Sequence, residues 1–216
     1  MKTSLRTEWP ILLIVAAPFI YLALQWNQLP ERVPLHWNIR GEIDRWGDKS
    51  ELWLIPILTT GLVYLIFLAV PAIDPKNKIR EMGVKYTQLK YIVTVCMAAL
   101  AVVIIHMTRT EGTLSPAPLL AVIGLLFAFL GNYFKTVRPN YFIGIRTPWT
   151  LEHPEIWNKT HRLGGVLWLI GGLLIVLVAA LANGPWLMYL FFGVTSVIVL
   201  VPLVYSYLLY RKLDLG

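Results

Sequence analysis

The sequence predicts an all-α membrane protein with six transmembrane helices, both chain ends in the cytoplasm, and a short extended segment in the first outer loop. Three observations lead to this prediction. Hydrophobic residues make up 57% of the 216 residues and charged residues only 14%, whereas a soluble domain averages about 25% charged residues. Long charge-free stretches recur, and a helix needs about 20 mostly apolar residues to cross a bilayer. Lys and Arg are divided unequally between alternate loops, which indicates orientation.

Charge-free stretches define the predicted spans in chain order. The first four are residues 9–30, 52–73, 91–108 and 112–134. The next stretch, residues 163–210, is too long for one helix, and the turn-forming tripeptide Asn183-Gly184-Pro185 divides it into two spans. No small-x-small cleavage site follows the first stretch, so we expect it to be retained as an anchor.

The distribution of Lys and Arg predicts how the protein is oriented. Fourteen of the nineteen lie on the side that carries both chain ends, and cytoplasmic loops of membrane proteins collect such residues. The net charge of +7 has the same explanation, so direct nucleic-acid binding is not expected. The order of elements divides the chain into an N-terminal helix pair with its outer loop, residues 1–75, and a four-helix region, residues 76–216.

The predicted spans lack the groups on which several function classes depend. All twelve acidic residues lie outside them, whereas ion-coupled transporters keep ionisable groups at bilayer depth. The chain has no HExxH zinc motif, no Gly-x-Ser-x-Gly elbow and no phosphate-binding glycine loop. We therefore expect a non-enzymatic protein without a metal or cofactor.

Small residues recur at seven-residue spacing in two of the predicted spans. One set comprises Gly124 and Gly131, and the other comprises Gly165, Gly172 and Ala179. Seven residues are about two helical turns, so each set lies on one face and allows another helix to approach closely. We interpret both sets as packing seams rather than as a substrate path.

The first outer loop, residues 27–51, alternates apolar and polar residues from Val33 to Arg40. A period of two predicts an extended, half-buried segment. Pro34 restricts this segment to an edge or irregular strand, and Gly41 is expected to supply a turn. An unpaired strand edge can accept an extended peptide through backbone hydrogen bonds. The alternative is that the apolar face only rests on helix ends or lipid headgroups.

The inner loop, residues 135–162, carries more local signals. Thr147-Pro148 and His153-Pro154 each predict a helix start, because proline suits the first helical turn. Basic and aromatic residues form a collar at the membrane interface, namely Arg138, Arg146, Trp149, Trp157, Lys159 and Arg162. Such a collar can contact anionic lipids or bind a partner.

Two segments resemble a known family. The inner segment Asn140-Tyr141-Phe142-Ile143-Gly144-Ile145-Arg146-Thr147-Pro148-Trp149-Thr150-Leu151, followed by Trp157, Lys159 and His161, resembles the signature of SdpI-type immunity proteins. The outer segment, with Pro30, Pro34, His36, Trp37, Asn38 and Gly41, resembles the small domain of unknown function that often precedes it. The resemblance implies a bacterial plasma-membrane protein that protects its cell from a secreted peptide toxin. It also implies that the toxin-occupied protein holds a winged-helix autorepressor at the membrane.

These expectations give each loop a role. The outer residues predicted to recognise the toxin are Pro30, Pro34, His36, Trp37, Asn38 and Gly41. The inner residues predicted to contact a partner are Asn140, Phe142, Gly144, Arg146, Thr147, Pro148, Trp149, Trp157, Lys159 and His161. The alternative function is a small transporter or lipid-handling protein whose collar binds an anionic ligand.

Overall fold

The computed structural model describes residues 5–40, 42–109, 115–182, 184 and 186–214. Within these residues, six helical segments are long and apolar enough to cross a membrane, as the sequence predicts. The elements in chain order are α1 (Leu5–Gln25), the 3-10 turn η1 (Trp26–Gln28), β1 (Arg32–Trp37), β2 (Ile43–Asp48), the 3-10 turn η2 (Lys49–Trp53), α2 (Leu54–Pro56), the π-helix η3 (Ile57–Leu62), α3 (Val63–Ile73), α4 (Lys78–Glu81), α5 (Val84–Arg109), α6 (Ala117–Phe134), α7 (Pro148–Glu152), α8 (Pro154–Leu181) and α9 (Trp186–Asp214).

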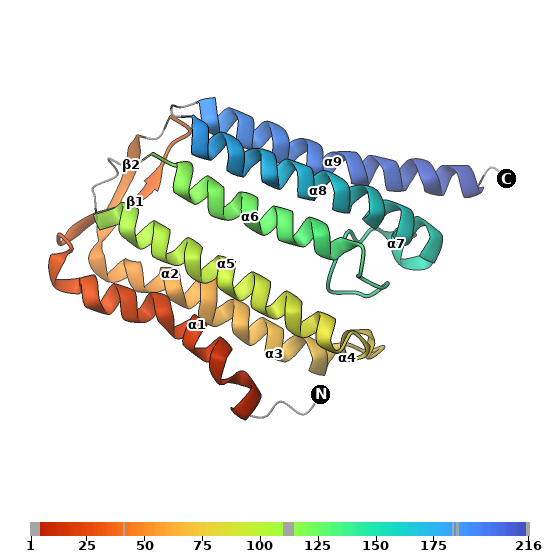
Figure 1. The fold of residues 1–216 in the computed structure, drawn as a ribbon, viewed down its shortest axis with the longest axis horizontal. Coiled ribbons are helices and arrows are strands. Elements are labelled where there is room, and N and C mark those ends of the chain that lie inside the picture. The colour runs from red at the N-terminus through yellow and green to blue at the C-terminus, as the bar shows by residue number, and fades with distance from the viewer. Residues whose placement is uncertain (1–4, 41, 110–114, 183, 185, 215–216) are drawn as a thin grey trace.

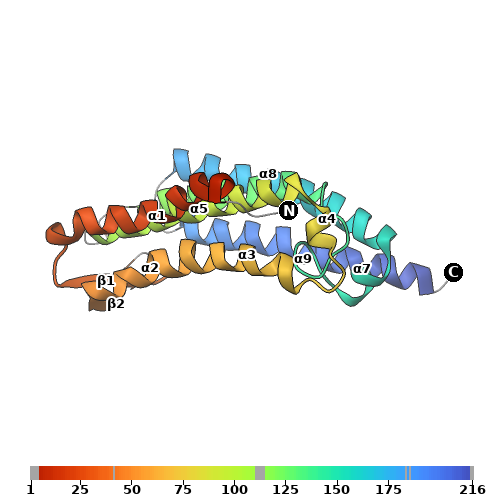
Figure 2. The ribbon, with the colours of Figure 1, turned by 90° about the horizontal axis from the view of Figure 1, so that it is seen from below.

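The long helices run side by side, with the β1–β2 hairpin at one end of the bundle and α4 and α7 at the other (Figure 1). We call these the hairpin end and the α7 end. Helix α5 packs against α1 and α3 on one side and against α6 on the other, and α8 lies between α6 and α9. Figure 2 shows α3 and α9 in a layer beneath α1, α5 and α8. The first turn of α1 and the last turn of α9 both lie at the α7 end, whose cytoplasmic location stays a prediction.

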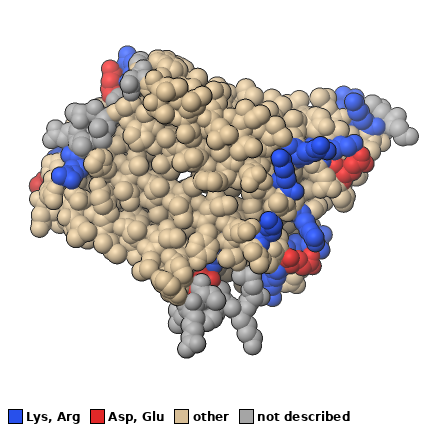
Figure 3. Space-filling view, in the orientation of Figure 1, with Lys and Arg blue, Asp and Glu red and all other residues tan. Residues whose placement is uncertain are grey.

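On the face seen in Figure 3, charged residues lie towards the two ends of the bundle. Figure 3 shows a broad middle free of Lys, Arg, Asp and Glu, with charged residues gathered towards the hairpin end and the α7 end. Large apolar side chains on the middle of the helices are exposed, as in Ile170 (60% exposed) and Leu177 (55% exposed). An uncharged, apolar outer surface of this kind is suited to lipid.

The predicted small-residue seams are confirmed, and they pack against each other where α6 meets α8. A Cβ atom added to Gly131 would lie 2.3 Å from the Leu169 backbone nitrogen. One added to Gly172 would lie 2.4 Å from the Ala128 backbone nitrogen and from the Gly124 carbonyl oxygen. Because the obstructing atoms belong to the backbone, only glycine permits this approach.

The predicted extended segment is confirmed as β1, which pairs antiparallel with β2. Val33 is fully buried in a cluster formed by Leu22, Leu29, Leu52 and Ile105, so β1 anchors the hairpin to the helices. The alternation fails further along, because the register shifts twice between Pro34 and Trp37. Pro34 is buried beside Val33, and after the shifts Ile39 is 42% exposed instead of facing inward.

The expectation that every acidic residue lies outside the spans was wrong, because Glu8, Glu51 and Glu155 fall within the helical segments that could cross a membrane. Of these three, Glu8 is the buried one. Helices α1 and α5 begin before the charge-free stretches, so the flanking charges enter the bundle. The Lys90 ammonium group donates to both Glu8 carboxylate oxygens, at 2.7 and 2.6 Å, and the Tyr64 hydroxyl donates to the same carboxylate at 3.1 Å. Glu8 is 8% exposed and Lys90 3% exposed. This buried ion pair joins α1 to α5 at the α7 end.

Candidate functional site

The side chain of Asn140, which is 4% exposed, organises the turn in the inner loop. Its amide oxygen accepts the backbone N–H groups of Phe142 and Ile143 at 2.8 and 2.7 Å. Its amide nitrogen donates to the carbonyl oxygens of Arg138 and Ile143 at 2.8 and 3.1 Å. With its polar atoms paired in this way, Asn140 shapes the turn rather than contacting a partner.

His161 on α8 ties the following part of the loop to the bundle. Its Nε2 accepts the Ile145 backbone N–H at 2.9 Å, and its Nδ1 lies 2.9 Å from the Trp157 carbonyl oxygen. A carbonyl can only accept, so Nδ1 carries the proton and the ring is neutral. The ring stacks on Trp157 at 4.0 Å between centroids. Gly144 passes so close, with φ of +111°, that an added Cβ would lie 2.3 Å from Nε2.

Two tryptophans fasten the loop to neighbouring helices. Trp157 is fully buried and its indole nitrogen donates to the Val137 carbonyl oxygen at 2.9 Å. The indole nitrogen of Trp149 donates to the Ser206 hydroxyl of α9 at 2.8 Å. Thr147 caps α7 by accepting the backbone N–H of Thr150, and Pro148 occupies the first turn, as predicted. Helix α7 is therefore held against α9 in a defined orientation.

The predicted inner residues thus divide into two groups. Six hold the loop in shape from inside, namely Asn140, Gly144, Thr147, Trp149, Trp157 and His161. Four present some or all of their surface to solvent, namely Phe142, Arg146, Pro148 and Lys159. Gly144 and Trp149 in the first group are half-buried, as Phe142 is, so they also keep some surface accessible to another molecule.

A further contact connects this loop to the segment between α3 and α4. The Lys76 ammonium group lies 5.1 Å from the centre of the Tyr141 ring. A side-chain hydrogen bond with Tyr141 raises the pKa of Lys76 above its ordinary value. The inner loop is thereby in contact with both halves of the chain.

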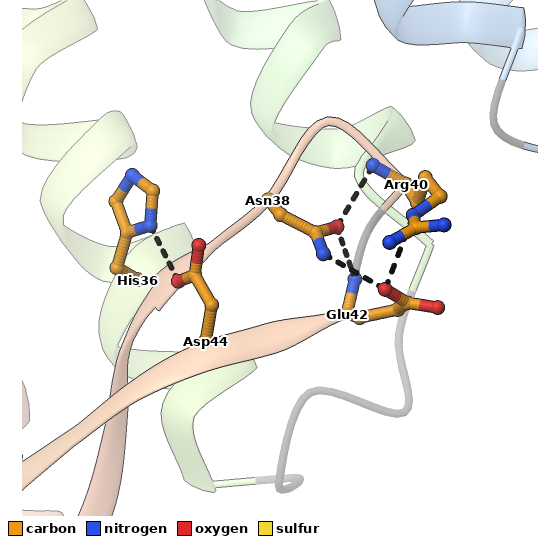
Figure 4. A network of polar contacts seen from close by, with 5 residues as sticks. All are labelled: His36, Asn38, Arg40, Glu42 and Asp44. Carbon is orange, nitrogen blue, oxygen red and sulfur yellow. Dashed lines mark hydrogen bonds and ion pairs between the residues drawn. The ribbon is translucent and has the colours of Figure 1, made fainter.

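The outer hairpin turns on Asn38 (Figure 4). Its side-chain oxygen accepts the backbone N–H groups of Arg40 and Glu42 at 2.9 and 3.1 Å, and its amide nitrogen donates to the Glu42 carboxylate at 2.8 Å. Beside the turn, His36 Nδ1 lies 2.6 Å from Asp44 Oδ1 across the two strands. Gly41, predicted to supply the turn, lies outside the described residues.

The remaining predicted outer residues are less accessible than expected. Pro34 is buried, and Pro30 and Trp37 are half-buried. The Trp37 indole nitrogen is buried with no hydrogen-bond partner among the described residues. The large apolar groups that face solvent are instead Ile39, 42% exposed, and Trp46, 44% exposed. Sequence analysis missed Trp46, although two short runs separated by turn-forming residues are a hairpin signal.

The base of the hairpin is closely packed and is linked by polar contacts to the start of the second span. A Cβ on Gly47 would lie 2.0 Å from Leu35 Cδ1, and Lys49 pairs with Glu31 at 2.6 Å. Asp48 caps η2 by accepting the Ser50 backbone N–H at 2.8 Å. This hydrogen bond, with a weaker contribution from the Ser50 side chain, lowers the pKa of Asp48. Across the described residues, no group of three or more His, Cys, Asp or Glu is arranged to hold a metal ion.

These observations define the class of protein: a multi-pass helical membrane protein with an ordered structure at each end of its bundle. Residues 135–206 match the model of the SdpI/YfhL protein family, and residues 13–60 match that of a domain of unknown function, DUF1648. The C-terminal part of the chain is thus similar to the SdpI/YfhL protein family, and the part that precedes it is similar to DUF1648, as the two resembling segments predict.

Two relatives show how far the similarity to individual proteins extends. The chain is 19% identical to "Immunity protein SdpI" of Bacillus subtilis (strain 168) over 203 residues, which cover 94% of this chain and 95% of that protein. It is 42% identical over 45 residues to an uncharacterized protein of Archaeoglobus fulgidus, covering 21% of this chain and 25% of the relative. No solved structure matches the chain.

Proposed function

We propose that this protein is a membrane immunity protein that protects its cell against a secreted peptide toxin, and that the hairpin recognises the peptide. The relationship to the immunity protein of Bacillus subtilis, which extends over 94% of the chain, supports the immunity function. The observation that carries the recognition role is the exposure of Ile39 in the hairpin turn and of Trp46 on β2, in a hairpin that the buried Val33 holds to the bundle.

The hairpin has the chemistry that an extended, partly apolar peptide requires. Within the described chain the sheet has two strands, so β2 keeps one edge free for backbone hydrogen bonds. Ile39 and Trp46 supply apolar contacts, and the His36–Asp44 and Arg40–Glu42 pairs supply polar groups nearby. The buried Val33 fixes this surface in place before any peptide arrives, which lowers the entropic cost of binding.

Exchange of the exposed tryptophan tests this assignment. Trp46→Ala is expressed in a toxin-sensitive bacterium. It is expected to lower the concentration of synthetic sporulation-delaying peptide that the cells survive at least tenfold, because aromatic anchors dominate such interfaces. Trp186→Ala is the matched control, since Trp186 is also 44% exposed but starts α9. Equal survival of both variants, at equal membrane levels, would refute recognition by the hairpin.

We further propose that the solvent-facing residues of the α7 end hold a winged-helix autorepressor. Arg146 is exposed on a loop fixed by Asn140 and His161. Lys159 is exposed near the start of α8 but pairs with Glu155 at 2.6 Å, so Arg146 supplies the positive charge that is free for a partner. Arg146→Glu is expected to abolish capture of the repressor in a membrane pull-down, while Lys212→Glu, at the end of α9, leaves it intact. Unchanged capture by Arg146→Glu would contradict this role.

A further inference from the structure

A basic pocket of about 520 Å³ lies at the α7 end, between the last turn of α6 and the first turns of α8. Its polar lining consists of Lys135, Asn158, His161 and Arg162. The volume falls within the range of about 300 to 1,000 Å³ that small-molecule sites occupy. No part of the function proposed above uses this pocket.

The pocket has the charge of an anion site. No Asp or Glu contributes to its lining, and neither Lys135 nor Arg162 forms an ion pair with any residue in the part of the chain that the structure describes. Lys135 lies close to α8, because a Cβ added to Gly165, one turn beyond Arg162, would lie 3.6 Å from its Cγ. Two cations and an amide donor therefore converge without internal neutralisation.

The pocket is polar on the side near the beginning of α8 and apolar on the side further into the bundle. Asn158 and Arg162 lie nearer the beginning of α8, and Val166 follows them one turn further into the bundle. The same helix face continues as an apolar stripe through Ile170 and Leu177, which are 60% and 55% exposed. A ligand that fills the pocket thus meets a cationic end near the water and an apolar track along the helix, which is the polarity of a phospholipid.

We propose that this pocket binds the phosphate headgroup of one anionic phospholipid, with an acyl chain lying along the exposed stripe of α8. The headgroup would accept hydrogen bonds from Lys135, Arg162 and Asn158. His161 links the site to the loop, because its ring lines the pocket and its Nε2 holds the Ile145 N–H. The bound lipid therefore stabilises the surface that carries Arg146.

Lipid binding to the full-length protein in detergent tests this proposal, with native mass spectrometry as the readout. One phosphatidylglycerol is expected to remain bound in preference to phosphatidylcholine. Lys135→Gln and Arg162→Gln are each expected to weaken phosphatidylglycerol binding about fivefold, and the double variant about 25-fold. Lys212→Gln, which removes an equal charge at the end of α9 outside the pocket, is the control and should bind as the original protein does.

Two further experiments are needed. One distinguishes loss of folding from loss of binding, and the other distinguishes binding of lipid from binding of free phosphate. The charge-retaining double variant Lys135→Arg, Arg162→Lys should keep the preference for phosphatidylglycerol, and thermal unfolding should show that each variant is folded. Inorganic phosphate at millimolar concentration should not displace the lipid. The proposal is overturned if the double glutamine variant binds phosphatidylglycerol normally, if the two lipids bind equally, or if phosphate alone competes.

Discussion

At the scale of single residues, the inner loop depends on one glycine and one histidine. Gly144 adopts φ of +111°, and its missing side chain leaves room for His161. Gly144→Ala adds both backbone strain and a clash with the ring that holds Ile145. We expect it to lower the free energy of unfolding by about 3 kcal/mol, measured by thermal unfolding in detergent.

Gly83→Ala is the control for backbone strain alone. Gly83 has φ of +54°, but no atom lies within 4 Å of an added Cβ. A left-handed conformation costs an alanine about 1 kcal/mol, so this variant should be clearly more stable than Gly144→Ala. Equal losses would mean that the contact with His161 contributes nothing.

Asp48 makes the base of the hairpin sensitive to acid. Its pKa is lowered in the folded protein, first by the hydrogen bond from the Ser50 backbone N–H. A group with a lowered folded pKa stabilises the fold above its unfolded pKa, and this stabilisation is lost as the pH falls through the folded pKa. We therefore expect the protection factor of the Ser50 amide, measured by NMR hydrogen exchange, to fall in acid.

Asp48→Asn separates this effect from general acid unfolding. The asparagine oxygen can still accept the Ser50 N–H, but it does not titrate in this range. The protection factor of the Ser50 amide, which is corrected for the intrinsic pH dependence of exchange, should then no longer fall in acid. If the protection factor falls in acid to the same extent in Asp48→Asn, another group is responsible.

At the scale of elements, backbone atoms rather than side chains set the distance between α6 and α8 at their glycine positions. Gly131→Ala and Gly172→Ala each place a methyl group within 2.4 Å of a backbone nitrogen, so the helices must separate. We expect each to reduce the free energy of unfolding by about 3 kcal/mol. Gly193→Ala in α9, where the space is open, should be neutral or stabilising by up to about 1 kcal/mol. The measurement is chemical unfolding in mixed micelles.

Elements with a local signal could be predicted from the sequence. Charge-free stretches gave the six spans, and glycine spacing identified the seam. Thr147-Pro148 located the start of α7. Each of these features is determined by residues close together in the chain, and the same proximity makes the irregular strand β1 recognisable.

Contacts between distant segments could not be predicted in this way. Glu8 and Lys90 are 82 residues apart, and each looked like the polar boundary of its own span. The internal role of His161 depends on Ile145, 16 residues earlier, folding back over α8. A conspicuous motif residue thus resembles a binding residue until the packing shows that it holds a loop.

At the scale of the whole molecule, the Glu8–Lys90 pair joins the first helix, which leads into the hairpin, to α5 and so to the rest of the bundle. Removing one partner leaves a buried charge without compensation. Glu8→Gln or Lys90→Met alone is therefore expected to cost about 3–5 kcal/mol of stability.

The double variant Glu8→Gln, Lys90→Met removes both charges and should be within about 1 kcal/mol of the original protein. Lys159→Gln is the control, because it breaks the exposed pair with Glu155, and exposed pairs contribute less than about 1 kcal/mol. A double-mutant cycle by thermal unfolding measures the coupling. If the single losses simply add in the double variant, the two charges do not stabilise each other, and α1 is held to α5 by apolar packing alone.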